Sequence, residues 1–216
     1  MQRASNISHE ALVSLEAILN INKIEGFKMV NQSEVYVSLE FTPNPNTLKY
    51  SVNQKLIEKG AVNFLNQAEA EGKSPLAVKL FSISGICGVM IGKDFVTVTK
   101  AEDGDWDVVH KSSSSIIERH LQDNEVVVIE AAIQDAHKGG SSDIEKRIKE
   151  ILDNEIRPAV AMDGGDITFE KFEDGIVYLY LQGSCSGCPS STATLKVGIE
   201  TRLRKEIPEI LEVVSV

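Results

Sequence analysis

The chain divides into two stretches of alternating strand and helix patterns, separated by a glycine- and serine-rich segment at residues 138–142. This segment, Lys-Gly-Gly-Ser-Ser, has the composition of a flexible linker, with Gly139 and Gly140 as the expected hinge. Each flanking stretch is long enough for one small hydrophobic core. We therefore expect an α+β protein made of two small α/β-sandwich-type domains joined by a flexible linker.

Four parts are expected along the sequence. Residues 1–32 form an N-terminal extension in which apolar residues recur at helical spacing, which predicts an amphipathic helix. Residues 33–122 form the first domain, residues 123–142 the linker and residues 143–216 the second domain. Within the linker, the apolar run at 125–130 predicts a piece that packs as a strand or covers a groove.

In the first domain, residues of alternating polarity predict strands at 35–41 and 48–52 and a hairpin within 85–100. Helices are expected at 62–71, from Pro75 to Phe81 with Ser74 as the N-cap, and from Asp105 to Leu121.

In the second domain, a helix is expected from Asp143, its predicted N-cap, to Arg157, ending before Pro158. A turn at 162–166 leads into a hairpin, 167–173 and 176–181, across an Asp-Gly pair that favours a type I′ turn. A helix at 190–206 and a strand at 211–216 complete the order α-β-β-α-β.

Cys185 and Cys188 lie where the second strand of that hairpin ends and the last helix begins. Unpaired N–H groups at a helix start favour the thiolate, which predicts a lowered pKa for Cys188. The polar, glycine-rich surroundings predict an exposed loop. Two thiols at C-x-x-C spacing suit an iron–sulfur cluster, a soft metal or a dithiol redox couple.

The number of ligands favours a shared site. An iron–sulfur cluster usually needs four cysteines, and structural zinc also needs four ligands, but this loop supplies two. We expect two chains to share one centre across a two-fold axis, as a homodimer. Two alternatives stay open, a thioredoxin-like dithiol redox protein and a zinc-stapled interaction module.

Other reactive side chains have simpler interpretations. Cys87, in a β-rich run, is expected to be a small buried residue. Asp163 and Asp166 could bind a hard metal or act as acid and base, but an ordinary turn is favoured. The histidines are expected in solvated or capping positions: 9, 110, 120 and 137. Because no catalytic triad or phosphate-binding loop appears, we expect no enzyme.

Charge and cysteine content limit the partners and the compartment. A net charge of −10 argues against nucleic acid and anionic membranes as partners. No apolar run is long enough to span a membrane. With three cysteines, no secretory signal and no transit-peptide bias, the sequence predicts a cytoplasmic protein.

Two groups of motifs resemble a known family. The turn Met-Asp-Gly-Gly-Asp at 162–166, the hairpin and Gly-Ser-Cys-Ser-Gly-Cys-Pro-Ser-Ser at 183–191 resemble the C-terminal domain of NifU-like (Nfu-type) iron–sulfur cluster scaffold proteins. The segments 41–50 and 92–100 resemble the Nfu N-terminal domain. Residues 1–32 lie outside the resemblance, and Cys87 departs from the family pattern.

The resemblance implies a carrier that receives a [4Fe–4S] cluster, or alternatively a [2Fe–2S] cluster, and passes it to apo-proteins. Cys185 and Cys188 occupy the positions of the family's cluster ligands, so the cluster would bridge two subunits. The N-terminal domain would recognise client proteins or upstream assembly factors.

Overall fold

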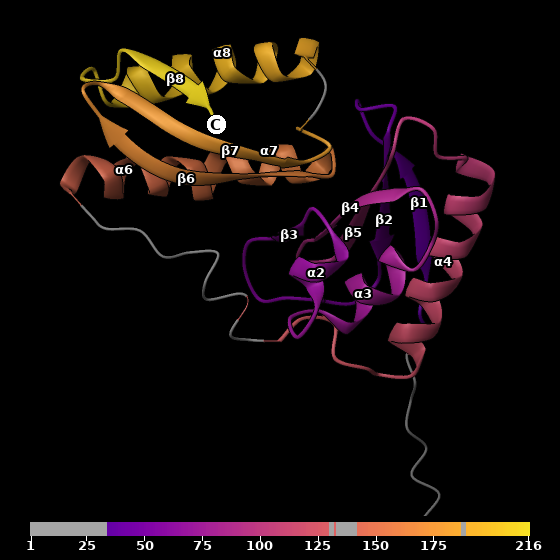
Figure 1. Ribbon diagram of the computed structural model, residues 1–216. Helices are drawn as coiled ribbons and strands as arrows, with labels where there is room; N and C mark the ends of the chain where they lie inside the picture. Colours follow the sequence, from indigo (N-terminus) through magenta and orange to yellow (C-terminus); the bar gives the residue numbers. More distant parts are fainter. Residues whose placement is uncertain (1–33, 130–131, 133–141, 187–188) are drawn as a thin grey trace, which may run out of the picture. The chain divides into compact units, whose positions relative to one another are not determined.

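A computed structural model describes residues 34–129, 132, 142–186 and 189–216 (Figure 1). Residues 34–216 form one compact unit that contains two β-sheets. The expected N-terminal helix, the Gly139–Gly140 hinge and Cys188 lie outside the described residues. None of the described helices is long and apolar enough to cross a lipid bilayer.

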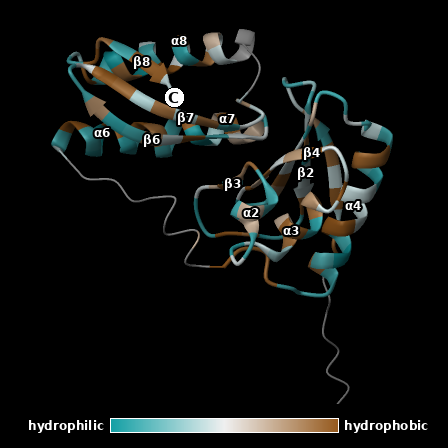
Figure 2. Cartoon of the chain, viewed as in Figure 1, coloured by the Kyte–Doolittle hydropathy of each residue, from teal (hydrophilic) through white to brown (hydrophobic). Residues whose placement is uncertain are grey.

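The first sheet has five antiparallel strands in the order β1-β2-β5-β4-β3. Their bounds are β1 Val37–Phe41, β2 Thr47–Val52, β3 Val62–Phe64, β4 Ile86–Ile91 and β5 Phe95–Lys100. Helices α2 (Gln67–Ala70), α3 (Pro75–Phe81) and α4 (Trp106–Gln122) accompany it. Figure 2 shows both hydrophobic and hydrophilic residues along α4, and its buried residues recur every three or four positions, as in an amphipathic helix.

One face of this sheet builds the first hydrophobic core. Leu48 and Tyr50 of β2 and Val96 of β5 join Leu80 of α3 and Ile117 of α4 in that core. Because strand side chains alternate, the residues between them point to the opposite face. That second face carries Thr47, Lys49, Met90, Phe95 and Thr97, all of which are buried.

The second sheet has three strands in the order β6-β7-β8. β6 (Gly165–Glu173) and β7 (Ile176–Gly183) form an antiparallel hairpin, and β8 (Glu212–Ser215) runs parallel to β7. Because parallel neighbours need a crossover, helix α8 (Pro189–Glu206) connects β7 to β8. The second core gathers residues of α6 (Asp143–Ile151), the π-helical turn (Leu152–Ile156), the sheet and α8: Ile148, Leu152, Ile167, Leu179, Ile199 and Leu203.

Many of the expected elements are confirmed. Ser74 and Asp105 cap α3 and α4 through their side chains. Asp174 and Gly175 turn the β6–β7 hairpin with φ of 51° and 81°, as a type I′ turn requires. The α+β class and the order α-β-β-α-β are also as predicted.

Two helix predictions were wrong. Val62–Phe64 is a strand because it pairs with β4, with Val62 opposite Ile91, and this pairing overrides the local helical pattern. The helix from 143 does not end before Pro158: α6 (Asp143–Ile151) passes through a π-helical turn (Leu152–Ile156) into α7 (Arg157–Met162). Pro158 lies in the first turn of α7, where its missing N–H is tolerated.

Two local predictions also need correction. The cap of α6 is Ser142, which forms a capping box with Glu145, rather than Asp143. The segment after α4 packs on the first core, as predicted, but its described residues 125–129 form no strand; Ser74 Oγ donates to the carbonyl of Val127 at 2.6 Å.

His120 corrects the expectation of solvated histidines. It is buried in α4, and its Nε2 lies 3.1 Å from the carbonyl oxygen of Val126. His110 is half-buried, with its ring stacked on Tyr50. His9 and His137 lie outside the described residues.

The buried His120 predicts a loss of stability in mild acid. Burial lowers its pKa below the ordinary 6.5, so the unfolded chain binds the proton more tightly than the folded one. The free energy of unfolding should fall as the pH drops below about 6.5, by at most ~1.4 kcal/mol per pH unit from this group. Chemical denaturation from pH 7.5 to 5 should show a shallower pH dependence for His120→Gln, and an unchanged slope would contradict the assignment.

Candidate functional site

Two loops meet at one end of the β6–β7 hairpin. Gly165, which begins β6, pairs with Gly183, which ends β7, so residues 162–164 lie beside residues 184–186. The backbone N–H of Ser184 donates to the carbonyl of Gly164 at 3.1 Å, and its hydroxyl donates to the carbonyl of Asp163. The glycine-rich turn and the cysteine loop therefore form one structural unit.

The Cys185 side chain occupies the space that a side chain on Gly165 would take. A methyl group built on Gly165 would lie 2.2 Å from the Cys185 Sγ, far inside van der Waals contact. Cys185 is 8% exposed and packs with the second core. The expectation of an exposed loop was therefore wrong for this residue, because the glycine turn creates a recess for the thiol that the loop composition alone does not reveal.

Burial keeps this thiol protonated. It raises the pKa of Cys185 to about 11; the nearby Asp163 and Asp166 charges act in the same direction, and a hydrogen bond with Ser184 opposes them. At neutral pH, Cys185 is a thiol that must lose its proton before it can bind a metal ion.

Two more glycines are required by the backbone. Gly164 and Gly183 have φ of 76° and 61°, the left-handed region that other residues rarely adopt. A methyl group on Gly183 would also lie 2.6 Å from the carbonyl oxygen of Gly164 and 2.6 Å from the Met90 Cε. The close approach of the two loops thus depends on three glycines.

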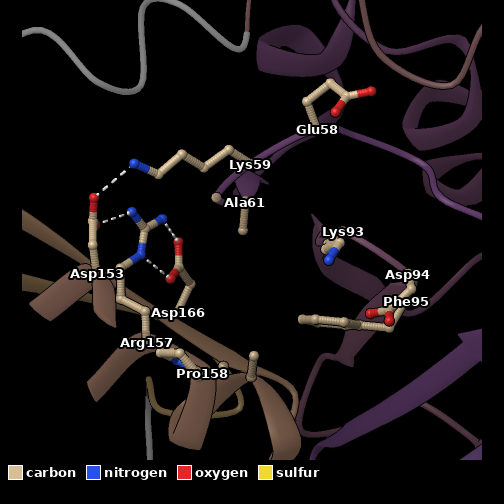
Figure 3. Close-up of a pocket in the computed structure, with 13 residues that line it drawn as sticks. Glu58, Lys59, Ala61, Lys93, Asp94, Phe95, Asp153, Arg157, Pro158 and Asp166 are labelled. Carbon is tan, nitrogen blue, oxygen red and sulfur yellow. Dashed lines mark hydrogen bonds and ion pairs between the residues drawn. The ribbon is translucent and has the colours of Figure 1, made fainter. Parts of the chain in front are cut away.

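Asp166 belongs to a buried ion pair. Its carboxylate accepts two hydrogen bonds from the Arg157 guanidinium, at 2.8 and 2.7 Å, and Arg157 also donates to Asp153 at 2.9 Å (Figure 3). Burial disfavours the charge on Arg157, but the two carboxylates outweigh this effect and raise its pKa overall. Asp166 therefore anchors the start of β6 to α7. This arrangement supports the ordinary-turn interpretation over a metal or acid–base pair.

Arg157 itself was missed by sequence reasoning. It lies nine residues before Asp166. The continuation of the helix into α7, which the sequence did not predict, brings it there. A charged residue inside an apolar helical stripe was the available signal.

The described residues supply one cysteine to this site. Cys188 lies outside them, and Cys87 is on β4 and exposed. The expectation that Cys87 is buried was wrong, because the ladder is irregular between Ile86 and Gly88 and leaves Cys87 without a partner in the pairing with β5. Within the described ranges, no cluster of three or more His, Cys, Asp or Glu side chains could hold a metal ion.

Comparisons with known proteins agree with this architecture. The sequence model described as NifU-like domain matches residues 148–214, and the one described as Scaffold protein Nfu/NifU N terminal matches residues 37–124. The human protein named NFU1 iron-sulfur cluster scaffold homolog, mitochondrial, is 40% identical over 82% of this chain and 70% of its own length. The chain belongs to the Nfu-type family of iron–sulfur scaffold proteins.

Two further similar proteins are an Arabidopsis relative and a solved yeast structure. NifU-like protein 4, mitochondrial, of Arabidopsis thaliana is 37% identical over 95% of this chain and 74% of its own length. A solution structure of a NifU-like protein from Saccharomyces cerevisiae covers 47% of this chain and 91% of that chain, with 26% identity and a TM-score of 0.41. The scaffold names agree with the expectation that this chain is not a catalyst.

The relatives correct the expected compartment. The human and Arabidopsis proteins are named as mitochondrial, so the prediction of a cytoplasmic protein was wrong. That prediction depended on the number of cysteines and on the lack of a secretory-signal or transit-peptide bias in the first residues. The number of cysteines does not distinguish the cytoplasm from the mitochondrial interior, and the composition of the first residues was a misleading guide.

The recess under Cys185 can be tested with a glycine substitution. Gly165→Ala places a methyl group against Sγ and should destabilise the fold by about 1–3 kcal/mol while displacing the thiol. Gly198→Ala is the matched control, because nothing lies within 4 Å of the added group and alanine favours the helix by ~0.5–1 kcal/mol. Denaturant titrations give the free energy of unfolding of each variant. A Gly165→Ala variant as stable as the unsubstituted protein would refute the recess.

Thiol reactivity tests the protonation state of Cys185. In a Cys87→Ser, Cys188→Ser variant, Cys185 is the one remaining thiol. Its alkylation rate in the iron-free protein should rise by about tenfold per pH unit beyond pH 9, where an ordinary thiol has levelled off. A rate that levels off near pH 8.5 would show an unperturbed thiol. Iodoacetamide labelling followed by mass spectrometry gives the rates.

Proposed function

We propose that this chain carries a [4Fe–4S] cluster, or alternatively a [2Fe–2S] cluster, held by Cys185 and Cys188 of two copies, and delivers it to apo-proteins. The number of thiols carries the proposal. Each chain contains three cysteines, of which two lie in the C-x-x-C loop, whereas a cluster needs about four. Cys87 lies on a strand of the other sheet.

The chemistry of the donors suits such cargo. Thiolates are the ligands that iron–sulfur clusters prefer, and the described site offers no hard-metal carboxylate cluster that would compete. Asp166 is already engaged by Arg157. The donors of this site therefore favour sulfur-bound cargo over ions such as Mg²⁺, which prefer oxygen ligands.

Release of the cargo follows from the state of Cys185. Because its pKa is raised to about 11, returning a proton to this sulfur is favourable at neutral pH once an iron–thiolate bond breaks. The recess over Gly165 can then take back the neutral thiol. Client cysteines would replace the ligands one at a time, which is the behaviour required of a carrier.

The partners follow from this role. Apo iron–sulfur proteins would receive the cluster, upstream assembly factors would supply it, and a second copy of the chain would complete the ligand set. The mitochondrial names of the relatives support a mitochondrial location for this activity. The domain boundaries at 33–122 and 143–216 remain part of the proposal, with 123–142 as the linker.

Cysteine variants test the ligand assignment. Cys185→Ser and Cys188→Ser should each abolish cluster retention, because a serine hydroxyl is a poor ligand for a labile cluster, while Cys87→Ser should retain it. After anaerobic reconstitution and desalting, iron, acid-labile sulfide and visible absorbance are measured for all three. Retention of the cluster by Cys188→Ser would contradict the assignment.

The same preparations distinguish the two other functions. Zinc without acid-labile sulfide would indicate a zinc-stapled interaction module. Turnover in an insulin-reduction assay by the metal-free protein would indicate a dithiol oxidoreductase. Either result, with no cluster bound, would overturn the carrier proposal.

A further inference from the structure

The second face of the five-stranded sheet contacts the loops around Cys185. Three side chains of this face and its adjoining turn donate to backbone carbonyls there. Thr97 Oγ1 lies 2.9 Å from the carbonyl oxygen of Gly164, and Lys49 Nζ lies 3.0 Å from that of Met162. Asn44 Nδ2 lies 2.7 Å from the carbonyl oxygen of Ser186, the residue directly after Cys185.

These three donors hold both halves of the site. Met162 and Gly164 belong to the turn that lies under the thiol, while Ser186 belongs to the loop that carries it. The contacts are close, since a methyl group on Gly164 would lie 3.2 Å from the Lys49 Cβ and 3.3 Å from the Thr97 Oγ1. The sheet therefore binds the turn and the loop together.

The donors are buried, which makes their partners necessary. Thr97 is 1% exposed, Asn44 5% and Lys49 8%. A buried lysine is costly unless its charge and N–H groups are satisfied. Besides the carbonyl of Met162, Lys49 has the Glu40 carboxylate at 2.8 Å and the Phe95 ring at 5.2 Å. A sheet face that needed no partner would not bury three polar donors.

We infer that this sheet face is an intramolecular clamp, in which Asn44, Lys49 and Thr97 act as positioning residues that keep the Cys185 loop closed in the cluster-free chain. The inference rests on the proposed function only in treating Cys185 as a cluster ligand. It assigns the first sheet a role toward the chain's own loop in addition to recognition of other proteins.

The composition of the contact suits reversible closure. Its apolar part is a small cluster of Ala61, Met90 and Phe95 with Ala161. Beside it lies a cavity of about 360 Å³, lined partly by charged side chains. A partly exposed ion pair joins Lys59 to Asp153 at 3.0 Å (Figure 3). Contacts within a chain that combine polar groups with a small apolar cluster resemble transient interfaces. The clamp can therefore open without unfolding either core.

The test removes the three hydrogen-bond donors while keeping the shapes of the side chains. Thr97→Val preserves the branched side chain, Lys49→Met preserves the apolar stem, and Asn44→Asp keeps the acceptor that binds the backbone N–H of Asn46. All are made in the Cys87→Ser, Cys188→Ser background, without cluster. Iodoacetamide labelling of Cys185 and amide hydrogen exchange of peptides spanning residues 160–186 are measured.

Loss of the clamp should accelerate both processes. Each hydrogen bond lost should raise the population of the open loop by roughly fivefold, so the triple variant should label on the order of 100 times faster. Exchange should increase at 162–166 and 183–186 but remain slow in β2 and β5. Thr97→Ser, which keeps the hydroxyl, should slow labelling by about fivefold relative to the triple variant when it replaces Thr97→Val in the set.

The matched control is Ser51→Ala. Ser51 is on β2 and donates to Glu40 rather than to the cysteine loop, so its loss should leave labelling unchanged. If the triple variant labels and exchanges like Ser51→Ala, the clamp is refuted; circular dichroism and denaturant titration verify that each variant is folded. The measurement uses cluster-free protein, so a failure to bind a cluster would refute the proposed function without affecting this result.

Discussion

The close packing of the Cys185 thiol against Gly165 is the constraint on which the site depends. The Cys185 Sγ fills the space that the side chain of any residue other than glycine would take at position 165. This contact fixes the register of the hairpin end, since Gly165 lies opposite Gly183, and it removes the thiol from water. A single steric requirement thus links the end of the β6–β7 hairpin, the protonation of a proposed ligand and the position of the loop.

Two further interactions stabilise this arrangement from opposite sides. The Arg157–Asp166 pair holds the start of β6 to α7, and both charges are satisfied in a bidentate geometry. From the other side, Thr97 and Lys49 bind the carbonyls of the preceding turn. The cysteine loop is therefore held by elements far apart in the sequence, although its chemistry lies within a few residues.

Local patterns predicted the elements whose structure depends on neighbouring residues. The type I′ turn at Asp174–Gly175 and the caps at Ser74 and Asp105 are examples, because turn and cap residues act over a few positions. Val62–Phe64 was misassigned because its partner strand lies almost thirty residues away. The burial of Cys185 was missed for the same reason, as the recess is formed by a turn twenty residues earlier.

The carrier hypothesis depends on two chains completing one ligand set, and the stoichiometry of the loaded protein tests it most directly. Native mass spectrometry of the anaerobically reconstituted protein gives the mass of the cluster-bound species in one step. The account predicts a mass of two chains plus one cluster, and a return to single chains when the cluster is removed. A species with one chain and a complete [4Fe–4S] cluster would contradict it.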